Sequence, residues 1–293
     1  MKNVKPQIAI VGAGLGGIAL ARQLTQINLN VVLFEKSRGV GGRIATRRLG
    51  ESFFNYGVHD FEIGQSNLSN LVQVGVNANI LKRDGNRCHA IQGINLWTKL
   101  LSENLEIKKE IHVDRLSINT HEIQLIDKNN EILGSFDTVV LALPAPQAFD
   151  LLSKSELVVS DLALVNYESC IKIMFKLKEQ KEISKLSTYF ENFTFRQDVY
   201  AADLKQDWHG PWLTLDKEVI KENIIKLCQL DLNDFSEFHA HKWRYSRVIE
   251  SISPVVQFQL KEKQIYLVGD YFYGNDLNSV LKSVEAVFTK LVN

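Results

Sequence analysis

The stretch "QIAIVGAGLGGIALARQLTQINLNVVLFEKS", residues 7–37, decides the fold. The apolar run Ile8–Val11 predicts a parallel strand that is covered on both faces. A glycine turn follows, and the apolar spacing over Gly16–Ile27 predicts a helix. Val31–Phe34, again entirely apolar, predicts a second strand. A strand, glycine turn, helix and strand in this order indicate a Rossmann-type βαβ unit.

The glycine turn has the spacing of a dinucleotide site. Gly12, Gly14 and Gly17 form G-x-G-x-x-G, in which the first glycine makes the turn, the second admits a pyrophosphate and the third allows close helix–strand packing. The helix N-terminus offers free N–H groups to the phosphates. Glu35, at the end of the second strand, can accept hydrogen bonds from ribose hydroxyls and would repel a 2′-phosphate. The predicted contacts in the turn itself are Gly12, Ala13, Gly14, Leu15 and Gly17.

Composition narrows the class of protein. The 293 residues include 34 Lys+Arg and 34 Asp+Glu, so the zero net charge gives no reason to expect nucleic acid or a membrane as a partner. No apolar stretch approaches the roughly 20 residues of a membrane span, and the N-terminus lacks the pattern of a signal peptide. Three dispersed cysteines, with no CxxC pair, fit a reducing cytoplasm. No metal site is predicted, because His239 and His241 have no third ligand nearby.

The remaining elements predict a divided domain. Helices are expected in "GINLWTKLLSENL", at about Lys217–Leu230 and from about Asn278, and strands in "TVVLAL", "CIKIMFKL" and "QIYLVG". Two prolines after "TVVLAL" are interpreted as a domain exit. The predicted fold is α/β, a discontinuous Rossmann-type dinucleotide-binding domain with an inserted α+β substrate domain. We assign residues 1–66, 88–150 and 255–293 to the dinucleotide-binding domain, and 67–87 and 151–254 to the substrate domain.

A second stretch, "FEKSRGVGGRIATRR" (residues 34–48), carries five positive charges around a glycine cluster. Gly41 and Gly42 let the backbone fold over a dinucleotide, and Arg43 can pair with its diphosphate. E-K-x-x-x-x-G-G-R after a βαβ unit resembles the FAD-binding signature of the amine oxidase and protoporphyrinogen oxidase superfamily. Within it, the stretch is most similar to renalases, which carry G-G-R-M-A-T-R-R. The resemblance implies non-covalently bound FAD, with Lys36 also at the site.

Other segments match the same family. "FFNYGVHDF" (53–61) resembles a segment that lies against the flavin, which implies contacts from Tyr56, Gly57 and Val58. "FDTVVLALPAPQAFDLL" and "HKWRYSR" also match, and alignment places Val113 at the adenine. "IYLVGDYFYGNDLNSVLKS" corresponds to the C-terminal flavin segment, which implies contacts from Gly269, Asp270, Asn278 and Ser279. Here "LNSV" replaces the family's V-E-G-A, so Ser279 adds a side chain where a glycine backbone should meet the ring.

The substrate side is less defined by motifs. There is no second G-x-G-x-x-G for a nicotinamide coenzyme, so electrons must reach the flavin directly from a small-molecule substrate. Trp243 and Tyr245 share one face of a predicted strand and can form an aromatic wall, although a Trp and a Tyr in a strand are more often core residues. Arg244 and His59 are the predicted polar groups that orient the substrate.

Three functions follow from these features. The renalase resemblance implies an oxidase of isomeric dihydronicotinamide dinucleotides that yields NAD(P)+ and passes electrons to O2. The first alternative is a flavin amine or alicyclic-ring oxidoreductase of the wider superfamily. The second is a non-catalytic FAD-binding interaction module. The oligomeric state is not predicted by the sequence.

Overall fold

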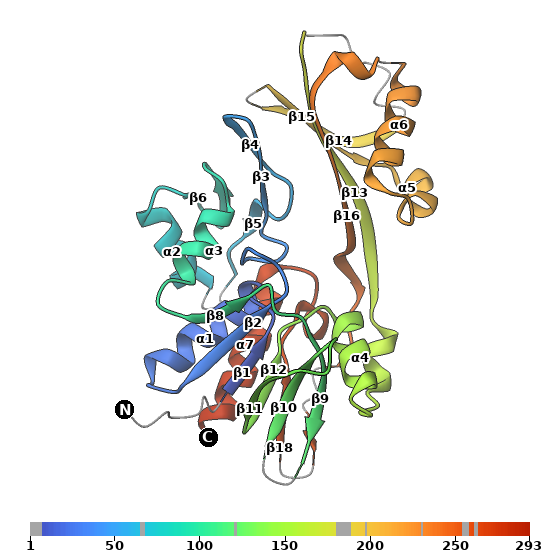
Figure 1. Cartoon of the computed structure of the whole chain (residues 1–293). Coiled ribbons are helices and arrows are strands. Elements are labelled where there is room, and N and C mark those ends of the chain that lie inside the picture. Colours follow the sequence, from blue (N-terminus) through green and yellow to red (C-terminus); the bar gives the residue numbers. More distant parts are fainter. Residues whose placement is uncertain are drawn as a thin grey trace. The chain divides into compact units, whose positions relative to one another are not determined.

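The computed structural model describes residues 8–64, 68–119, 122–179, 189–196, 198–229, 231–253, 258–260 and 263–293. The chain forms two compact units (Figure 1). The first comprises the described parts of Met1–Ala45, Val58–Asn166 and Val248–Asn293, and the second Thr46–Gly57 and Tyr167–Arg247. Each unit is described by itself.

The first unit is built on a six-stranded sheet in the order β17-β18-β12-β1-β2-β8. Its strands are β1 (Ile8–Val11), β2 (Val31–Glu35), β8 (Glu106–Lys109), β12 (Thr138–Leu141), β17 (Phe258–Leu260) and β18 (Lys263–Leu267). All neighbours pair in parallel except β17, which runs antiparallel to β18. Every residue of β1, β2 and β12 is buried, which confirms the parallel strands predicted from their continuous apolar runs.

Helices α1 (Leu15–Gln26) and α7 (Leu277–Val292) belong to the core of this unit. They touch at their first turns, since a Cβ added at Gly16 would lie 3.0 Å from Cγ1 of Val280. Helices α2 (Leu68–Asn77) and α3 (Asn95–Leu101) add to the same core beside a small sheet. That sheet comprises β5 (Asp60–Glu62), β7 (Arg87–Ala90) and β6 (Leu81–Asp84) in spatial order.

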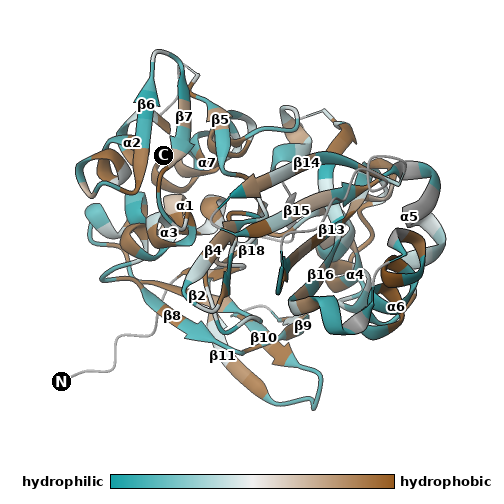
Figure 2. Cartoon of the chain, turned by 90° about the horizontal axis from the view of Figure 1, so that it is seen from above, coloured by the Kyte–Doolittle hydropathy of each residue, from teal (hydrophilic) through white to brown (hydrophobic). Residues whose placement is uncertain are grey.

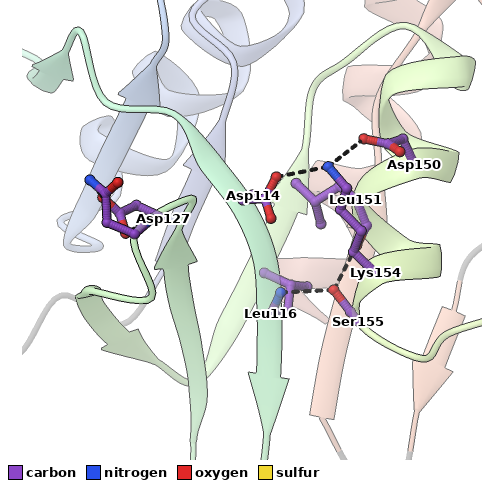
Figure 3. Close-up of polar contacts among 8 residues, drawn as sticks. Asp114, Leu116, Asp127, Asp150, Leu151, Lys154 and Ser155 are labelled. Carbon is purple, nitrogen blue, oxygen red and sulfur yellow. Dashed lines mark hydrogen bonds and ion pairs between the residues drawn. The ribbon is translucent and has the colours of Figure 1, made fainter.

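A three-stranded antiparallel sheet also belongs to the first unit. It consists of β9 (Val113–Ile118), β10 (Ile123–Asp127) and β11 (Ile132–Phe136), and helix α4 (Ala145–Lys154) packs beside β9. Lys154 of α4 lies between Asp114 and Asp150 (Figure 3), and its Nζ is 2.8 Å from Asp114 Oδ1 and 3.0 Å from Asp150 Oδ2. Ser155 Oγ accepts a hydrogen bond from Leu116 N. The prolines at 144 and 146 therefore begin a helix rather than mark a domain exit, because proline is tolerated in a helix's first turn.

The second unit has a four-stranded sheet in the order β14-β15-β13-β16. The strands are β14 (Phe190–Arg196), β15 (Val199–Leu204), β13 (Asn166–Leu177) and β16 (Phe235–Glu250). Helices α5 (Gln206–Trp212) and α6 (Lys217–Cys228) lie beside the sheet, and α6 shows both teal and brown along its ribbon in Figure 2. Ile220 and Ile224 of α6 share a core with Ile171, Ile173 and Phe175 of β13.

A hairpin of β3 (Thr46–Leu49) and β4 (Ser52–Asn55) also belongs to the second unit. Leu49 and Phe54 pack against Met174, Val199 and Ala201 of the sheet. The short helices η1 (Ser160–Leu164), η3 (Leu232–Asp234) and η4 (Asp270–Phe272) complete the described elements. None of the helices in the described ranges is both long and apolar enough to cross a membrane.

The compact units group some segments differently from the predicted domains. Residues 68–87 and 151–166 lie in the first unit, because the side chains of Leu68 and Val72 join its core and α4 continues the chain from β12. Residues 46–57 lie in the second unit, because the β3–β4 hairpin packs on that unit's sheet.

Candidate functional site

The glycine turn joins β1 to α1 at the carboxyl edge of the parallel sheet. Gly12 has φ +105°, and a Cβ there would lie 2.5 Å from the carbonyl oxygen of Ala142. A Cβ at Gly17 would lie 2.1 Å from the carbonyl oxygen of Gly12. These two positions therefore require glycine for the fold itself. A Cβ at Gly14, in contrast, would meet nothing within 4 Å, so the absence of a side chain there leaves open space in front of the helix.

The N-terminus of α1 is open in the described structure. Its N-cap residue is Gly14, no side chain caps it, and its first turn has no acidic residue. Leu15 and Ala13, the other predicted residues of the turn, are buried. An uncapped helix N-terminus at the carboxyl edge of a parallel sheet is the usual place for a pyrophosphate.

Glu35 lies against this turn and is held by two backbone N–H groups. It is 8% exposed, and its Oε2 accepts from Ala13 N at 2.9 Å while Oε1 accepts from Ser37 N at 2.8 Å. A carboxylate can accept about four hydrogen bonds, so each oxygen retains capacity for a ribose hydroxyl. Ile111 N donates to Glu35 O, and Val113 begins β9 two residues later. Lys36 is exposed and its Nζ donates to Gln147 Oε1 at 3.3 Å.

The glycine loop after β2 folds back on the turn. Gly41 has φ +112°, donates its N–H to Ala13 O, and forms a parallel bridge with Gly14. A Cβ at Gly42 would lie 3.3 Å from Gly14 Cα. Val58 N donates to Arg43 O, which ties the next segment to this loop. The two stretches that the sequence singles out therefore form one structure.

Arg43 pairs with Asp270 rather than standing alone. Arg43 Nη1 lies 2.7 Å from Asp270 Oδ2, and the Asp270 side chain is only 3% exposed. The other oxygen, Asp270 Oδ1, is buried and has no hydrogen-bond partner among the described residues. A buried acceptor without a donor is costly, which fits a ligand hydroxyl or water at this point. Gly269 N donates to Ser283 Oγ, and a Cβ at Gly269 would collide with the ring of Tyr271.

The N-terminus of α7 is closed, unlike that of α1. Asp276 is its N-cap, and Oδ1 accepts from Ser279 N at 2.7 Å and from Ser279 Oγ at 2.6 Å. Asn278 donates to Asp276 Oδ2 and to Glu62 O, and its own Oδ1 accepts from Gly64 N. Asn278 and Ser279, predicted to meet the flavin, are thus engaged in capping and bracing this helix. Asp276 is not among the residues predicted from the sequence, although an Asp directly before a helical run is a known N-cap signal.

The second unit carries an aromatic cluster on β16 and the segment after β4. Tyr56 stacks on Trp243 with 5.5 Å between their ring centroids. The centroid of the His241 ring lies 4.8 Å from that of Tyr56 and 4.3 Å from that of Trp243. Trp243 Nε1 donates to Tyr56 O at 3.2 Å. Burial, together with the charges of Lys217 and Arg47, lowers the pKa of His241 to about 4, and burial raises the pKa of Tyr56. His241 is therefore neutral at physiological pH.

The other predicted substrate residues do not join this cluster. Tyr245 packs against Tyr167 at 5.5 Å, and Arg244 is exposed. Arg47 Nη2 donates to His239 Nδ1 at 2.9 Å. Gly57 belongs to the second unit, whereas His59 is an exposed residue of the first. From its spacing in the sequence, His241 could be considered only as a metal ligand that lacks a third partner. Within the described residues no three metal-binding side chains gather.

Comparisons with known proteins agree with this geometry. The profile of the family described as "NAD(P)-binding Rossmann-like domain" matches residues 10–73. The matched range includes the glycine turn, α1 and β2 of the first unit. A candidate protoporphyrinogen oxidase from Exiguobacterium sp. 255-15 has a crystal structure that aligns with TM-score 0.70 and 13% identity over 99% of both chains. That identity shows the fold alone.

Two curated proteins match over short stretches. A lysine-specific histone demethylase 1B homolog of Caenorhabditis elegans is 43% identical over 44 residues, which are 15% of this chain and 5% of that protein. A 4-hydroxybenzoate brominase (decarboxylating) of Marinomonas mediterranea is 46% identical over 48 residues, 16% of this chain and 9% of that protein. The chain thus matches less than a tenth of either protein's length.

Proposed function

We propose that this chain is an FAD-dependent oxidoreductase with a renalase-like activity, which oxidises isomeric dihydronicotinamide dinucleotides to NAD(P)+ with O2 as electron acceptor. The observation that supports FAD binding is the uncapped N-terminus of α1, which has an acid on each side. Glu35 lies on one side, and on the other lies the buried Asp270, whose Oδ1 has no hydrogen-bond partner among the described residues. The fold shared with a candidate protoporphyrinogen oxidase supports a flavin in this place.

The residues of the first unit have distinct roles in this proposal. The N–H groups at the start of α1 bind the pyrophosphate, and Glu35 binds the adenosine ribose. Asp270 Oδ1 would accept a hydrogen bond from a hydroxyl of the flavin side chain, and Arg43 holds this carboxylate in place through their 2.7 Å ion pair. The cofactor, when bound, accepts a hydride from the substrate and passes electrons to O2.

The second unit supplies the substrate residues in this proposal. The stacked Tyr56 and Trp243 offer flat, largely apolar surfaces, which suit a dihydronicotinamide ring. A neutral His241 beside them can donate or accept a hydrogen bond without adding a charge. Arg244, exposed on the same strand, is the proposed partner of a substrate phosphate.

A stopped-flow comparison tests the reaction. The purified protein is expected to be yellow, and anaerobic mixing with 6-dihydroNAD should bleach its absorbance near about 450 nm faster than NADH or a panel of amines. Faster bleaching by an amine would favour the flavin amine oxidoreductase. If no substrate reduces a bound flavin, the chain is a non-catalytic FAD-binding module, and a colourless protein that cannot take up FAD contradicts the cofactor assignment.

Arg244→Ala separates binding from chemistry. We expect a raised KM for 6-dihydroNAD with kcat unchanged, because the arginine would hold the phosphate and not the reacting carbon. Arg247→Ala, which removes an exposed arginine of the same strand that pairs with Glu168, is the matched control. Equal effects of both substitutions would contradict the role of Arg244.

A further inference from the structure

Asp276 places a carboxylate on the N-terminus of α7. The three donors that bind it, Ser279 N, Ser279 Oγ and Asn278 Nδ2, are all neutral groups at 2.6–3.2 Å. Burial opposes ionisation, but the hydrogen bonds from Ser279 and Asn278 and the charge of Lys282 outweigh it and hold the pKa of Asp276 below its usual value. The helix therefore carries a full negative charge at the end where its dipole is positive.

The order of the strands brings the redox half of a dinucleotide toward this helix. Glu35 ends β2, so the adenosine lies on the β2 side of β1. A dinucleotide whose pyrophosphate rests on α1 must extend its other half past β1, toward the carboxyl ends of β12 and β18. Asp270 follows β18 directly, and α7 begins a few residues later with its first turn against that of α1.

A second observation at the same edge also points to a ligand. The Asp270 side chain is 3% exposed, and its Oδ1 has no partner in the described part of the chain. Tyr273 N and Gly274 N donate to Asp270 O, so the turn that begins at this acid ends two residues before the α7 cap. The two acids differ in one respect, since Arg43 compensates the charge of Asp270 while the donors to Asp276 are neutral.

We propose that Asp276 lowers the reduction potential of the bound flavin by holding a negative charge, bound by neutral hydrogen-bond donors, at the N-terminus of α7. This inference rests on the proposed function. Reduction adds negative charge to the flavin, and a free helix N-terminus would stabilise that charge. The carboxylate of Asp276 opposes it, so the reduced cofactor gives its electrons to an acceptor more readily.

Asp276→Asn removes the charge and keeps the cap, because asparagine caps helices as well as aspartate. The measurement is the ratio of reduced to oxidised flavin when the holoprotein is equilibrated with reference dyes at a fixed potential. We expect this ratio to rise about tenfold, which is the scale for one nearby charge and corresponds to about 30 mV for two electrons. Asp276→Ser, also an uncharged cap, should give the same shift if the first variant folds poorly.

Glu285→Gln is the matched control, since it removes one negative charge from the same helix about 14 Å further along. The expected ratio is that of the unmodified protein. A ratio unchanged in both Asp276 variants, or changed equally by Glu285→Gln, overturns the role of Asp276 while FAD binding stands. A protein that takes up no flavin overturns the proposed function and this inference together.

Discussion

Two helix N-termini lie side by side in the first unit, and only one of them is capped by a carboxylate. The first turn of α1 has no acid and no side-chain cap, whereas α7 begins on Asp276, which binds Ser279 through both its N–H and its hydroxyl. The chain therefore leaves one positive helix end available to an anion and neutralises the other. An open helix end and a capped one can serve different parts of the same cofactor.

The difference arises from very few residues. Gly14 leaves free space in front of α1, since a Cβ there would have no neighbour within 4 Å. At α7, Asn278 bonds to both Asp276 and Glu62 O and accepts from Gly64 N, so the cap is braced by a neighbouring segment. The comparison predicts that substitutions at α1 mainly affect cofactor binding, whereas those at α7 mainly affect stability and reduction potential.

The largest effect is expected from the contrast of two glycines in the α1 turn. Gly17→Ala should destabilise the protein by about 3 kcal/mol or more, because its Cβ would lie 2.1 Å from a backbone oxygen. Gly14→Ala should change the unfolding free energy by less than about 0.5 kcal/mol but weaken FAD binding by about 1–3 kcal/mol. Chemical denaturation and FAD titration of both variants check this, and equal stabilities would contradict it.

Removal of the acid beside the open helix should have the next largest effect. Glu35→Ala should weaken FAD binding by about 1–3 kcal/mol, because hydrogen bonds to a charged group are lost. The backbone donors Ala13 N and Ser37 N also lose their acceptor, so the free protein should become less stable. Fluorescence titration with FAD measures the first effect. Unchanged affinity would mean that the ribose does not bind Glu35.

Loss of the α7 cap should have a smaller effect on the free energy of unfolding. Asp276→Ala should destabilise the protein by about 1 kcal/mol at pH 7, whereas Asp276→Asn should destabilise it less, because asparagine keeps the cap and loses only the ionic contribution. Because the folded pKa of Asp276 is lowered, its ionic contribution is present above the unfolded value of 3.8 and is lost as pH falls through the folded value. Denaturant melts between pH 7 and 2 measure this, and a larger effect of Asp276→Asn at pH 2 than at pH 7 would contradict it.

The smallest effect at neutral pH concerns His241 in the second unit, whose acid response can be separated from that of Asp276. Its folded pKa of about 4 lies below the ordinary histidine value of 6.5, so the stability it contributes is present above pH 6.5 and is lost as pH falls toward 4. His241→Phe should flatten the stability profile between those values and leave it unaltered above pH 7. If the slope of the unfolding free energy against pH were unaltered in that window, a group other than His241 would cause the loss of stability.

The sequence predicted the first unit better than the second. Continuous apolar runs and the glycine spacing fixed β1, α1 and β2 within one residue at each end, because local backbone requirements at Gly12 and Gly17 decide that structure. Pro144 and Pro146 could not distinguish a domain exit from a helix start, since prolines both end strands and begin helices such as α4. Segment 46–57 could not be assigned to the second unit from the sequence, because its partners there, Met174 and Ala201, lie more than a hundred residues away along the chain.

The candidate site was predicted unevenly for similar reasons. The glycines and Glu35 follow a local pattern, whereas the Arg43–Asp270 pair joins residues 227 positions apart. Tyr56, His241 and Trp243 form a cluster that alternation along one strand could suggest only in part. The role of Asp276 depends on which hydrogen bonds it accepts, and these are visible only in the structure.

The central claim is that the open N-terminus of α1 binds the pyrophosphate of FAD, and ligand-dependent unfolding of the flavin-free protein tests it most directly. FAD and FMN share the flavin ring, but only FAD carries the pyrophosphate and adenosine. FAD at about 100 times its Kd should stabilise the protein by about 2.7 kcal/mol, ADP should compete with it, and FMN at the same concentration should stabilise far less. Equal stabilisation by FAD and FMN, or by neither, would contradict the claim.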